Sequence, residues 1–242
     1  MSSLKPVSSP VPKHVGIILD GNRRFAKRLM MKPWKGHEWG KEKVIKVLEW
    51  AKELGIEEIT FYAFSMQNFN RPKEEFDYLM KIFKEMLQEL LEKLEKKDKS
   101  VQDMMVRFIG RIKLFPSEIK DKMLEVMEKT AGKKKYTVNF AMAYGGREEV
   151  MDAVLKIAEQ LKKGLLDVSQ INEEVFSKNL YMADEPDMII RTGGEKRTSN
   201  FLIWQGNYAE LIFLDKMWPE IEKTDLVACI EEYKQRERRF GR

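Results

Sequence analysis

The stretch HVGIILDGNRR, residues 14–24, decides how the rest of the chain is interpreted. Its first half is a short apolar run typical of a buried strand, and its second half turns polar at Asp20, Gly21 and Asn22. A strand that ends in a polar loop is typical of parallel sheets, in which ligands gather where the strands end. The loop is therefore the first candidate site, although an Asp-Gly turn beside two solvated arginines would look the same in isolation.

Four further apolar runs follow, and helical patterns separate them. Strands are predicted at residues 57–65, 104–110, 136–146 and 187–194, and helices at residues 39–54, 72–97, 116–132, 147–163 and 172–180 and after Thr224. Strands that alternate with helices predict an α/β fold with a mainly parallel sheet and right-handed crossovers. With 242 residues, 43% of them hydrophobic, the chain is read as a single domain.

The ends and the cysteine content predict where the protein resides. Residues 1–12 are rich in Ser and Pro and lack the apolar middle of a secretory signal, so they are read as a disordered lead-in to a domain over residues 13–242. No apolar run approaches the roughly 20 residues that span a bilayer. The single cysteine, Cys229, fits a reducing compartment. A cytoplasmic location is expected.

The first loop carries the groups that a diphosphate and a divalent cation require. Gly21 permits close approach of backbone to a ligand, and Arg23 or Arg24 can bind phosphate oxygens through charge-assisted hydrogen bonds. Asp20 would supply a hard oxygen ligand to Mg²⁺. The net charge of +5 suits an anionic ligand without selecting which one.

A second stretch, RTGGEKRTSNF at residues 191–201, has a similar composition. It places Arg191, Arg197 and Ser199 around two glycines, which suits a second diphosphate. A glycine turn with surface charge is the simpler alternative.

Several other classes of protein are disfavoured. His37 stands next to a glutamate, but no second histidine follows at the spacing of a zinc-binding helix, so His37 either contacts phosphate, relays a proton or simply faces solvent. Neither glycine-rich nucleotide motif occurs. The lysines lie among glutamates on helices, which argues against nucleic-acid binding.

Taken in order, the motifs of this chain resemble the cis-prenyltransferase family, also called undecaprenyl diphosphate synthases. They are HVGIILDGNRRFAK (14–27), GHEWG (36–40), ITFYAFSMQNFNRP (59–72), NFAMAYGGREE (139–149), IIRTGGEKRTSNFLIWQGNYAELIF (189–213) and RERRFG (236–241). The resemblance implies that residues 13–242 form the catalytic domain. It also implies a homodimer, a six-stranded sheet flanked by helices, and a hydrophobic tunnel for the growing chain.

The resemblance implies a role for individual residues as well. Asp20, Asn68 and His37 would be catalytic, and Asp20 and Glu210 would bind Mg²⁺, Glu210 from the same chain or from a partner subunit. The residues that would bind substrate are Gly21, Asn22, Arg23, Arg24, Phe25, Ser65, Arg71, Arg191, Arg197 and Ser199. The last three of these would hold isopentenyl diphosphate, and the end of the chain, RERRFGR at residues 236–242, would reach the active site across the dimer.

The implied activity is the repeated condensation of isopentenyl diphosphate with an allylic prenyl diphosphate, to give a long (Z)-polyprenyl diphosphate. Peripheral contact with a membrane would serve product release. The alternative is a non-catalytic partner subunit of a prenyltransferase complex. Such relatives lose the aspartate and arginine motifs that this chain retains.

Overall fold

Six parallel strands form one sheet in the computed structural model, which describes residues 11–133 and 135–236. The strands are β1 (His14–Ile18), β2 (Glu58–Ser65), β3 (Met104–Ile109), β4 (Tyr136–Tyr144), β5 (Met188–Arg191) and β6 (Glu210–Phe213). Their order across the sheet is β3-β4-β2-β1-β5-β6. The predicted α/β class and parallel six-stranded sheet are confirmed.

The strand order reverses direction at β1, which pairs with β2 on one side and with β5 on the other. The chain first builds outward through β2, β3 and β4 and then returns to add β5 and β6 at the opposite edge. Loops that leave β1 and β5 therefore diverge at the carboxyl end of the sheet, where folds of this type place their ligands. Both polar stretches singled out above follow these two strands.

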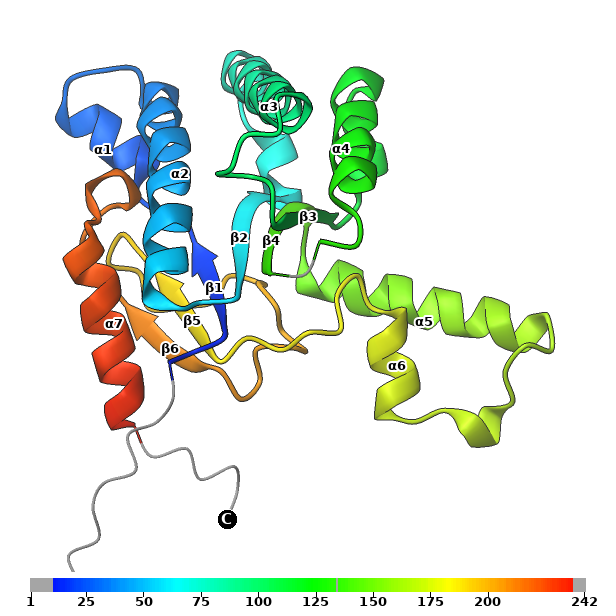
Figure 1. Ribbon diagram of the computed structural model, residues 1–242. Coiled ribbons are helices and arrows are strands. Elements are labelled where there is room, and N and C mark those ends of the chain that lie inside the picture. The colour runs from blue at the N-terminus through cyan, green and yellow to red at the C-terminus, as the bar shows by residue number, and fades with distance from the viewer. Residues whose placement is uncertain (1–10, 134, 237–242) are drawn as a thin grey trace, which may run out of the picture.

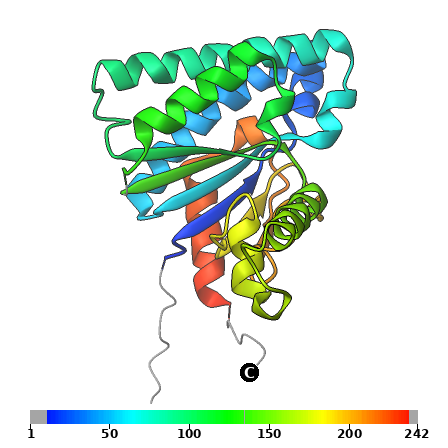
Figure 2. The ribbon, with the colours of Figure 1, turned by 90° about the vertical axis from the view of Figure 1, so that its right-hand side faces the viewer.

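Helices cover both faces of the sheet (Figures 1 and 2). They are α1 (Asn22–Arg28), α2 (Gly36–Leu54), α3 (Lys73–Glu95), α4 (Ser117–Thr130), α5 (Gly146–Lys162), α6 (Glu173–Asn179) and α7 (Lys223–Gln235). The larger apolar core joins one face of the sheet to α2, α3, α4 and α7. Phe61 of β2 is fully buried there, and each such side chain contributes about 1.5–3 kcal/mol by leaving water.

Three local predictions differ from the structure. Residues 22–24 of the polar stretch were expected on a loop and lie in the first turn of α1. Helix α2 begins at Gly36 rather than at residue 39, because its first turn packs on α1 so closely that a Cβ on Gly36 would lie 1.9 Å from the carbonyl oxygen of Asn22. Strand β6 was not predicted. It is as short as β5, but it lies at the edge of the sheet with only one buried residue, whereas all four residues of β5 are buried.

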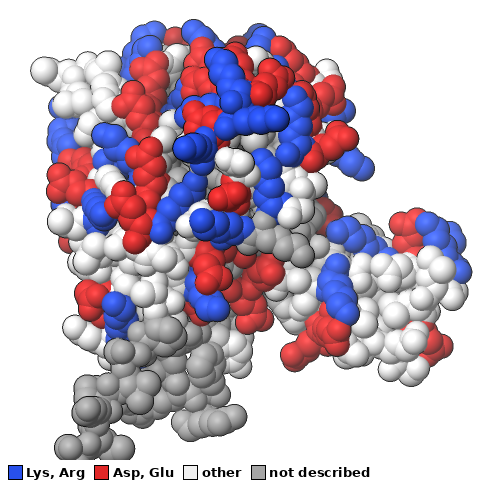
Figure 3. Space-filling model, viewed as in Figure 1, with Lys and Arg blue, Asp and Glu red and all other residues white. Residues whose placement is uncertain are grey.

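An arm formed by α5 and α6 projects from the body of the molecule (Figure 1). On the face shown in Figure 3, charges of both signs mingle over the body, whereas much of the arm is uncharged. Met151, Val154 and Leu155 of α5 are 55%, 45% and 61% exposed. Their spacing places them on one side of the helix.

Within the described ranges, none of the helices combines the length and the apolar composition needed to cross a bilayer. Residues 1–10 of the predicted lead-in and residues 237–242 of the predicted dimer-crossing segment lie outside the described residues.

Candidate functional site

Gly21 joins β1 to α1 in a backbone conformation that favours glycine. Its φ is 103°, and a Cβ at this position would lie 2.7 Å from the Cβ of Met217. The chain consequently turns directly from Asp20 into α1, and the helix carries Asn22, Arg23 and Arg24. Residues that the sequence placed on a loop are thus held by a helix.

Asp20 is the meeting point of the two polar stretches. Its carboxylate accepts hydrogen bonds from Arg191 Nη2 at 2.9 Å and from its neighbour Gly21 N at 2.6 Å, and Arg24 Nη2 lies 3.2 Å away. The hydroxyl of Thr192 donates to the Asp20 carbonyl at 2.7 Å. The two stretches, 171 positions apart in sequence, therefore form one site at the carboxyl ends of β1 and β5.

The electrostatics keep Asp20 ionised. Partial burial opposes the charge, but the hydrogen bond from Arg191, the charges of Arg24 and Arg191, and the Gly21 N–H outweigh it, so the pKa of Asp20 lies below its ordinary value. A carboxylate held in this state can bind a cation without first losing a proton.

Arg191 organises the second stretch from a buried position, with 5% of its surface exposed. Its Nη1 donates to Ser199 Oγ at 2.7 Å and to the carbonyl oxygen of Arg197 at 2.6 Å. The side chain of Arg197 instead extends to solvent, 59% exposed, and pairs with Glu195. Arg191 thus links Ser199 to Asp20. Arg197 takes part in this arrangement only through its backbone carbonyl, which accepts a hydrogen bond from Arg191.

A third polar group lies beside α1. Arg71 Nη1 is 3.1 Å from His37 Nε2 and donates to Glu75 Oε1 at 2.8 Å, and Arg23 approaches the other Glu75 oxygen to 3.5 Å. Burial is the main reason why the pKa of His37 lies below its ordinary value. His37 is therefore neutral near pH 7 and can accept a proton.

Three other predicted residues take more local positions. The side chain of Asn68 accepts a hydrogen bond from Ser65 N at 3.0 Å and so closes the turn Met66–Asn70 after β2. The ring of Phe25 packs edge-on against Trp39, with 5.6 Å between ring centroids. Ser65 lies near Ser199, because both line a small surface pocket at this edge.

An apolar cavity opens next to these groups, between the sheet and helices α2 and α3. Asn22, His37, Asn68 and Arg71 line its polar end. Its walls are apolar residues that include Ala63, Leu79, Ile82, Phe83, Met86, Leu87, Leu90, Phe108, Met123 and Phe140. A second cavity farther along α2 and α3 shares Lys41, Val44, Met86, Leu90 and Phe140 with it. Polar and cationic side chains thus lie beside an apolar space.

Glu210 lies far from Asp20 within one chain. It is the first residue of β6 and is in register with Met188 of β5, which pairs with Val15 near the start of β1. Asp20 follows the other end of β1, on the order of 15 Å away along the strand direction. Glu210 instead binds Arg236, with 2.8 Å between Oε2 and Nη1. Of the two predicted possibilities for Glu210, binding of the metal together with Asp20 of the same chain does not fit this position, and the role predicted for Glu210 would require a partner subunit.

Asp20 alone still suits a magnesium ion. Mg²⁺ in such sites takes one or two carboxylates, and waters and substrate phosphates complete its coordination. No cluster of three or more His, Cys, Asp or Glu side chains that could form an all-protein metal site occurs among residues 11–133 and 135–236. The donor set therefore fits a cation that arrives with a phosphorylated ligand.

Sequence reasoning missed Glu75 and Thr192. Glu75 had a recognisable signal, because it occupies a position of the apolar stripe that continues at Leu79 and Ile82, and an acid there demands a partner. Thr192 had none, since its role depends on the contact between β5 and the Asp20 backbone.

A doubly wound sheet with two arginine-rich segments at its switch point and an apolar cavity beside them is suited to phosphorylated ligands with apolar chains. A profile of the prenyltransferase family described as undecaprenyl diphosphate synthase matches residues 18–241. The chain belongs to this family of prenyltransferases.

Similar proteins agree with that assignment. A tritrans,polycis-undecaprenyl-diphosphate synthase (geranylgeranyl-diphosphate specific) of Methanopyrus kandleri is 46% identical over 96% of this chain and 85% of its own. A ditrans,polycis-undecaprenyl-diphosphate synthase ((2E,6E)-farnesyl-diphosphate specific) of Micrococcus luteus is 42% identical over 97% and 93%. The structure of lavandulyl diphosphate synthase from Lavandula x intermedia with dimethylallyl diphosphate superposes with a TM-score of 0.89, at 34% identity over 96% of this chain and 99% of the other.

Proposed function

We propose that this chain condenses isopentenyl diphosphate with an allylic prenyl diphosphate in cis geometry, repeatedly, to make a long (Z)-polyprenyl diphosphate. The observation that carries the proposal is the junction of Asp20, Arg191 and Ser199 beside the polar mouth of an apolar cavity. Two diphosphates can be held at this mouth while a hydrocarbon chain extends inward. The cavity between the sheet and α3 would be the start of the product tunnel.

The residues of the chain bind and orient the two substrates. Arg23, Arg24 and the backbone at Gly21 and Asn22 would surround the allylic diphosphate, and Arg191, Ser199 and a reoriented Arg197 would hold isopentenyl diphosphate. Guanidinium groups stabilise the charge that develops on a departing diphosphate more than they stabilise the bound substrate. Mg²⁺ held by Asp20 would add Lewis-acid stabilisation of the same leaving group.

Each condensation forms one carbon–carbon bond and breaks one carbon–oxygen bond. The terminal alkene carbon of isopentenyl diphosphate forms a bond to C1 of the allylic partner, and the bond from C1 to oxygen breaks, so that diphosphate leaves with the electron pair. A proton then leaves C2 of the isopentenyl unit and restores an allylic double bond. His37 and Asn68 line the cavity mouth, where they could receive or relay this proton through the departing phosphate oxygens.

Geranylgeranyl diphosphate is the primer that the relatives favour. Several archaeal relatives at 42–46% identity carry that specificity in their names, whereas the Micrococcus luteus relative is named for farnesyl diphosphate. We propose the geranylgeranyl primer for this chain.

The experiment incubates purified protein with Mg²⁺, isopentenyl diphosphate and one primer at a time: dimethylallyl, farnesyl or geranylgeranyl diphosphate. Chromatography of the dephosphorylated alcohols gives product length and kcat/KM for each primer. The expected result is a long-chain product with the highest kcat/KM for geranylgeranyl diphosphate. Product with none of the primers would overturn the proposal and favour a non-catalytic partner subunit.

A homodimer and peripheral contact with a membrane belong to the same proposal. The apolar side of α5 supports the dimer, because Met151, Val154 and Leu155 form an exposed apolar patch in the monomer and such patches mark interaction surfaces. A second copy could supply the Glu210 that one chain cannot bring to Asp20. The membrane contact would receive a product too apolar to leave into water.

A further inference from the structure

Glu75 is a buried acid in the first turn of α3. Only 1% of its surface is exposed, and its apolar neighbours on the helix, Leu79 and Ile82, are buried with it. A carboxylate in such a position is strongly destabilising unless charged partners and hydrogen bonds compensate it. The structure supplies those partners from three separate elements.

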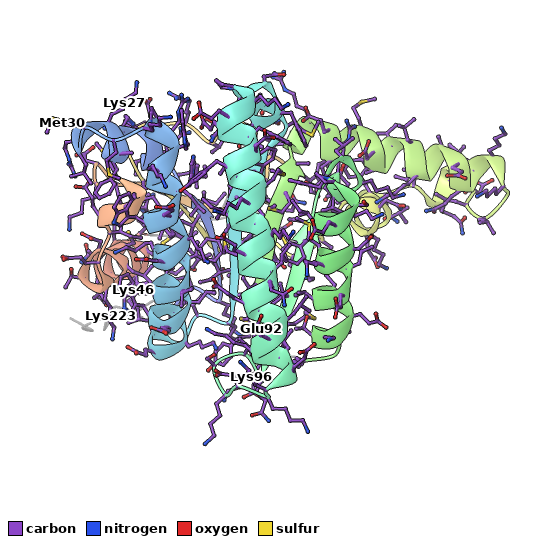
Figure 4. All side chains as sticks on the ribbon, turned by 90° about the horizontal axis from the view of Figure 1, so that it is seen from above. Lys27, Met30, Lys46, Glu92, Lys96 and Lys223 are labelled. Atoms are coloured by element: carbon purple, nitrogen blue, oxygen red, sulfur yellow. The ribbon has the colours of Figure 1, made fainter. Side chains whose placement is uncertain are left out.

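Each oxygen of Glu75 faces a cationic or polar donor. Oε1 accepts from Arg71 Nη1 at 2.8 Å and lies 3.8 Å from His37 Nε2, while Oε2 lies 3.5 Å from Arg23 Nη2. Arg23 belongs to α1, His37 to the first turn of α2, and Arg71 to the end of the turn that precedes α3. Figure 4 shows the first turns of α2 and α3 at the same end of the molecule as Lys27 and Met30 of the α1 region, with Glu92 and Lys96 at the other end.

Glu75 stands behind its partners rather than beside the ligand space. His37 and Arg71 line the cavity, and Glu75 is not among the lining residues. Both of its oxygens are already engaged, so the carboxylate is a poor candidate for a metal ligand or a general base. Two guanidinium groups and one carboxylate leave a net positive charge at the cavity mouth, which suits an anion.

We propose that Glu75 is a positioning residue, which holds Arg71, Arg23 and His37 in the arrangement that binds a substrate diphosphate at the cavity mouth. Only the identity of that diphosphate rests on the proposed function. Glu75 itself does not touch the ligand. Without the carboxylate, the two guanidinium groups repel each other and the imidazole loses its neighbour on α3.

The test uses Glu75→Gln, which keeps the side-chain volume and removes the charge. Glu74→Gln is the matched control, because Glu74 is the adjacent residue and forms an exposed pair with Lys32. Two measurements are made on each protein: calorimetric titration with inorganic diphosphate and a pH titration of the histidine rings by NMR. The chain has only two histidines, and His14 lies in a separate cluster with Thr60, so its resonance is an internal reference.

The expected result in Glu75→Gln is a Kd for inorganic diphosphate that rises about tenfold or more. The groups that face His37 are Glu75, Arg71 and Arg23, and Glu75 is the one that raises its pKa. The pKa of His37 should therefore fall in Glu75→Gln, while the pKa of His14 stays at its wild-type value. In Glu74→Gln, the pKa values of both histidines should stay at their wild-type values. The fall in the His37 pKa shows that the charge has been removed beside the imidazole, and a purely structural role would lower the melting temperature without weakening diphosphate binding by the folded protein.

Unchanged or tighter diphosphate binding by folded Glu75→Gln would overturn the proposal. It would mean that Glu75 only neutralises part of the positive charge of the two arginines and does not position them. Absence of diphosphate binding by the wild type would also overturn it. Should Glu75→Gln fail to fold, Glu75→Asp keeps the charge with a shorter reach, and weaker diphosphate binding is again expected. Intact diphosphate binding without prenyl transfer would contradict the proposed function alone.

Discussion

The role of Asp20 depends on the side chains that contact it. Its carboxylate forms ion pairs with Arg191 and Arg24, and its backbone carbonyl accepts a hydrogen bond from Thr192. Removal of this one charge affects the hold on a cation and the placement of both arginines. The consequences should appear in the chemistry more than in the fold, because Asp20 lies at the rim of the sheet and outside the apolar core.

For Asp20→Asn we expect kcat for condensation to fall on the order of 10²–10³-fold. The amide cannot balance the arginines or anchor a cation at the leaving group. Steady-state kinetics with saturating substrates measures the change, and Asp77→Asn, an exposed position on α3, is the control. Near-normal turnover in Asp20→Asn would rule out the assigned role.

Arg197 provides a test of a side chain that must move. In this structure it points to solvent, so its contact with isopentenyl diphosphate requires a rotation toward Arg191. A charge-assisted contact of about 1.5–3 kcal/mol predicts that Arg197→Ala raises KM for isopentenyl diphosphate roughly 10- to 100-fold with a smaller change in kcat. Lys196→Ala, exposed and adjacent, should behave as wild type, and an unchanged KM in Arg197→Ala would contradict the assignment.

At the scale of elements, β2 and α3 form opposite walls of the cavity. Ala63 lies in the wall formed by β2, and Leu79 and Phe83 lie in the wall formed by α3. The small side chain leaves space that a longer one would fill, and packed walls yield little, at a cost of about 1–3 kcal/mol for overpacking.

We therefore expect Ala63→Leu to keep the first condensations and to shift the product distribution toward shorter chains. Chromatography of the dephosphorylated alcohols resolves the distribution, with Ala228→Leu on the exposed side of α7 as the control. An unchanged distribution at normal activity would show that the product does not pass Ala63. A dead enzyme would place Ala63 at the chemistry itself.

Helix α5 is anchored by a buried acid, Glu149. Burial is the main reason why its pKa lies above the ordinary value, although Tyr181 N, Gln205 and Tyr144 all donate to it. A carboxyl with a raised folded-state pKa contributes stability that is present below its unfolded-state pKa and is lost as pH rises through the folded-state value.

Glu149→Gln cannot ionise, so its melting temperature relative to wild type should increase between about pH 5 and about pH 8. Thermal unfolding followed by circular dichroism measures this difference. Glu159→Gln, an exposed position on the same helix, should show a difference that does not change with pH. A constant difference for Glu149→Gln would mean that Glu149 stays ionised across the range.

The sequence predicted the elements whose patterns are long and missed those that depend on contacts. Apolar alternation located β1 to β5, and apolar spacing located the long helices. Strand β6 was missed because it is a short edge strand with a single buried residue, whereas the equally short β5 is buried throughout. Helix α1 was missed because its start depends on the packing of Gly21 against Met217. The arginine-rich stretches were found from composition, but the outward turn of Arg197 and the place of Glu210 at the far end of β6 depend on tertiary structure.

At the scale of the whole molecule, the apolar side of α5 predicts self-association. Leu155→Asp places a charge among Met151 and Val154, and we expect it to convert a dimer to a monomer in analytical ultracentrifugation. Activity should fall with the dimer if a second copy supplies Glu210. Leu124→Asp, at a similarly exposed apolar position on α4, is the control, and a wild type that is monomeric at micromolar concentration would contradict the prediction.

The ion pair between Asp20 and Arg191 also bears on how the protein matures during synthesis. Its two members are 171 positions apart, and the strands that carry them, β1 and β5, are adjacent and parallel. Such non-local pairing forms late, because a long loop must close before the contact is made. A nascent chain that has emerged only as far as α6 can assemble β1 to β4 with their helices, yet it lacks the arginine that completes the anion site. The pairing of Asp20 with Arg191 is therefore complete only after β5 has joined the sheet beside β1, when most of the chain has been synthesised.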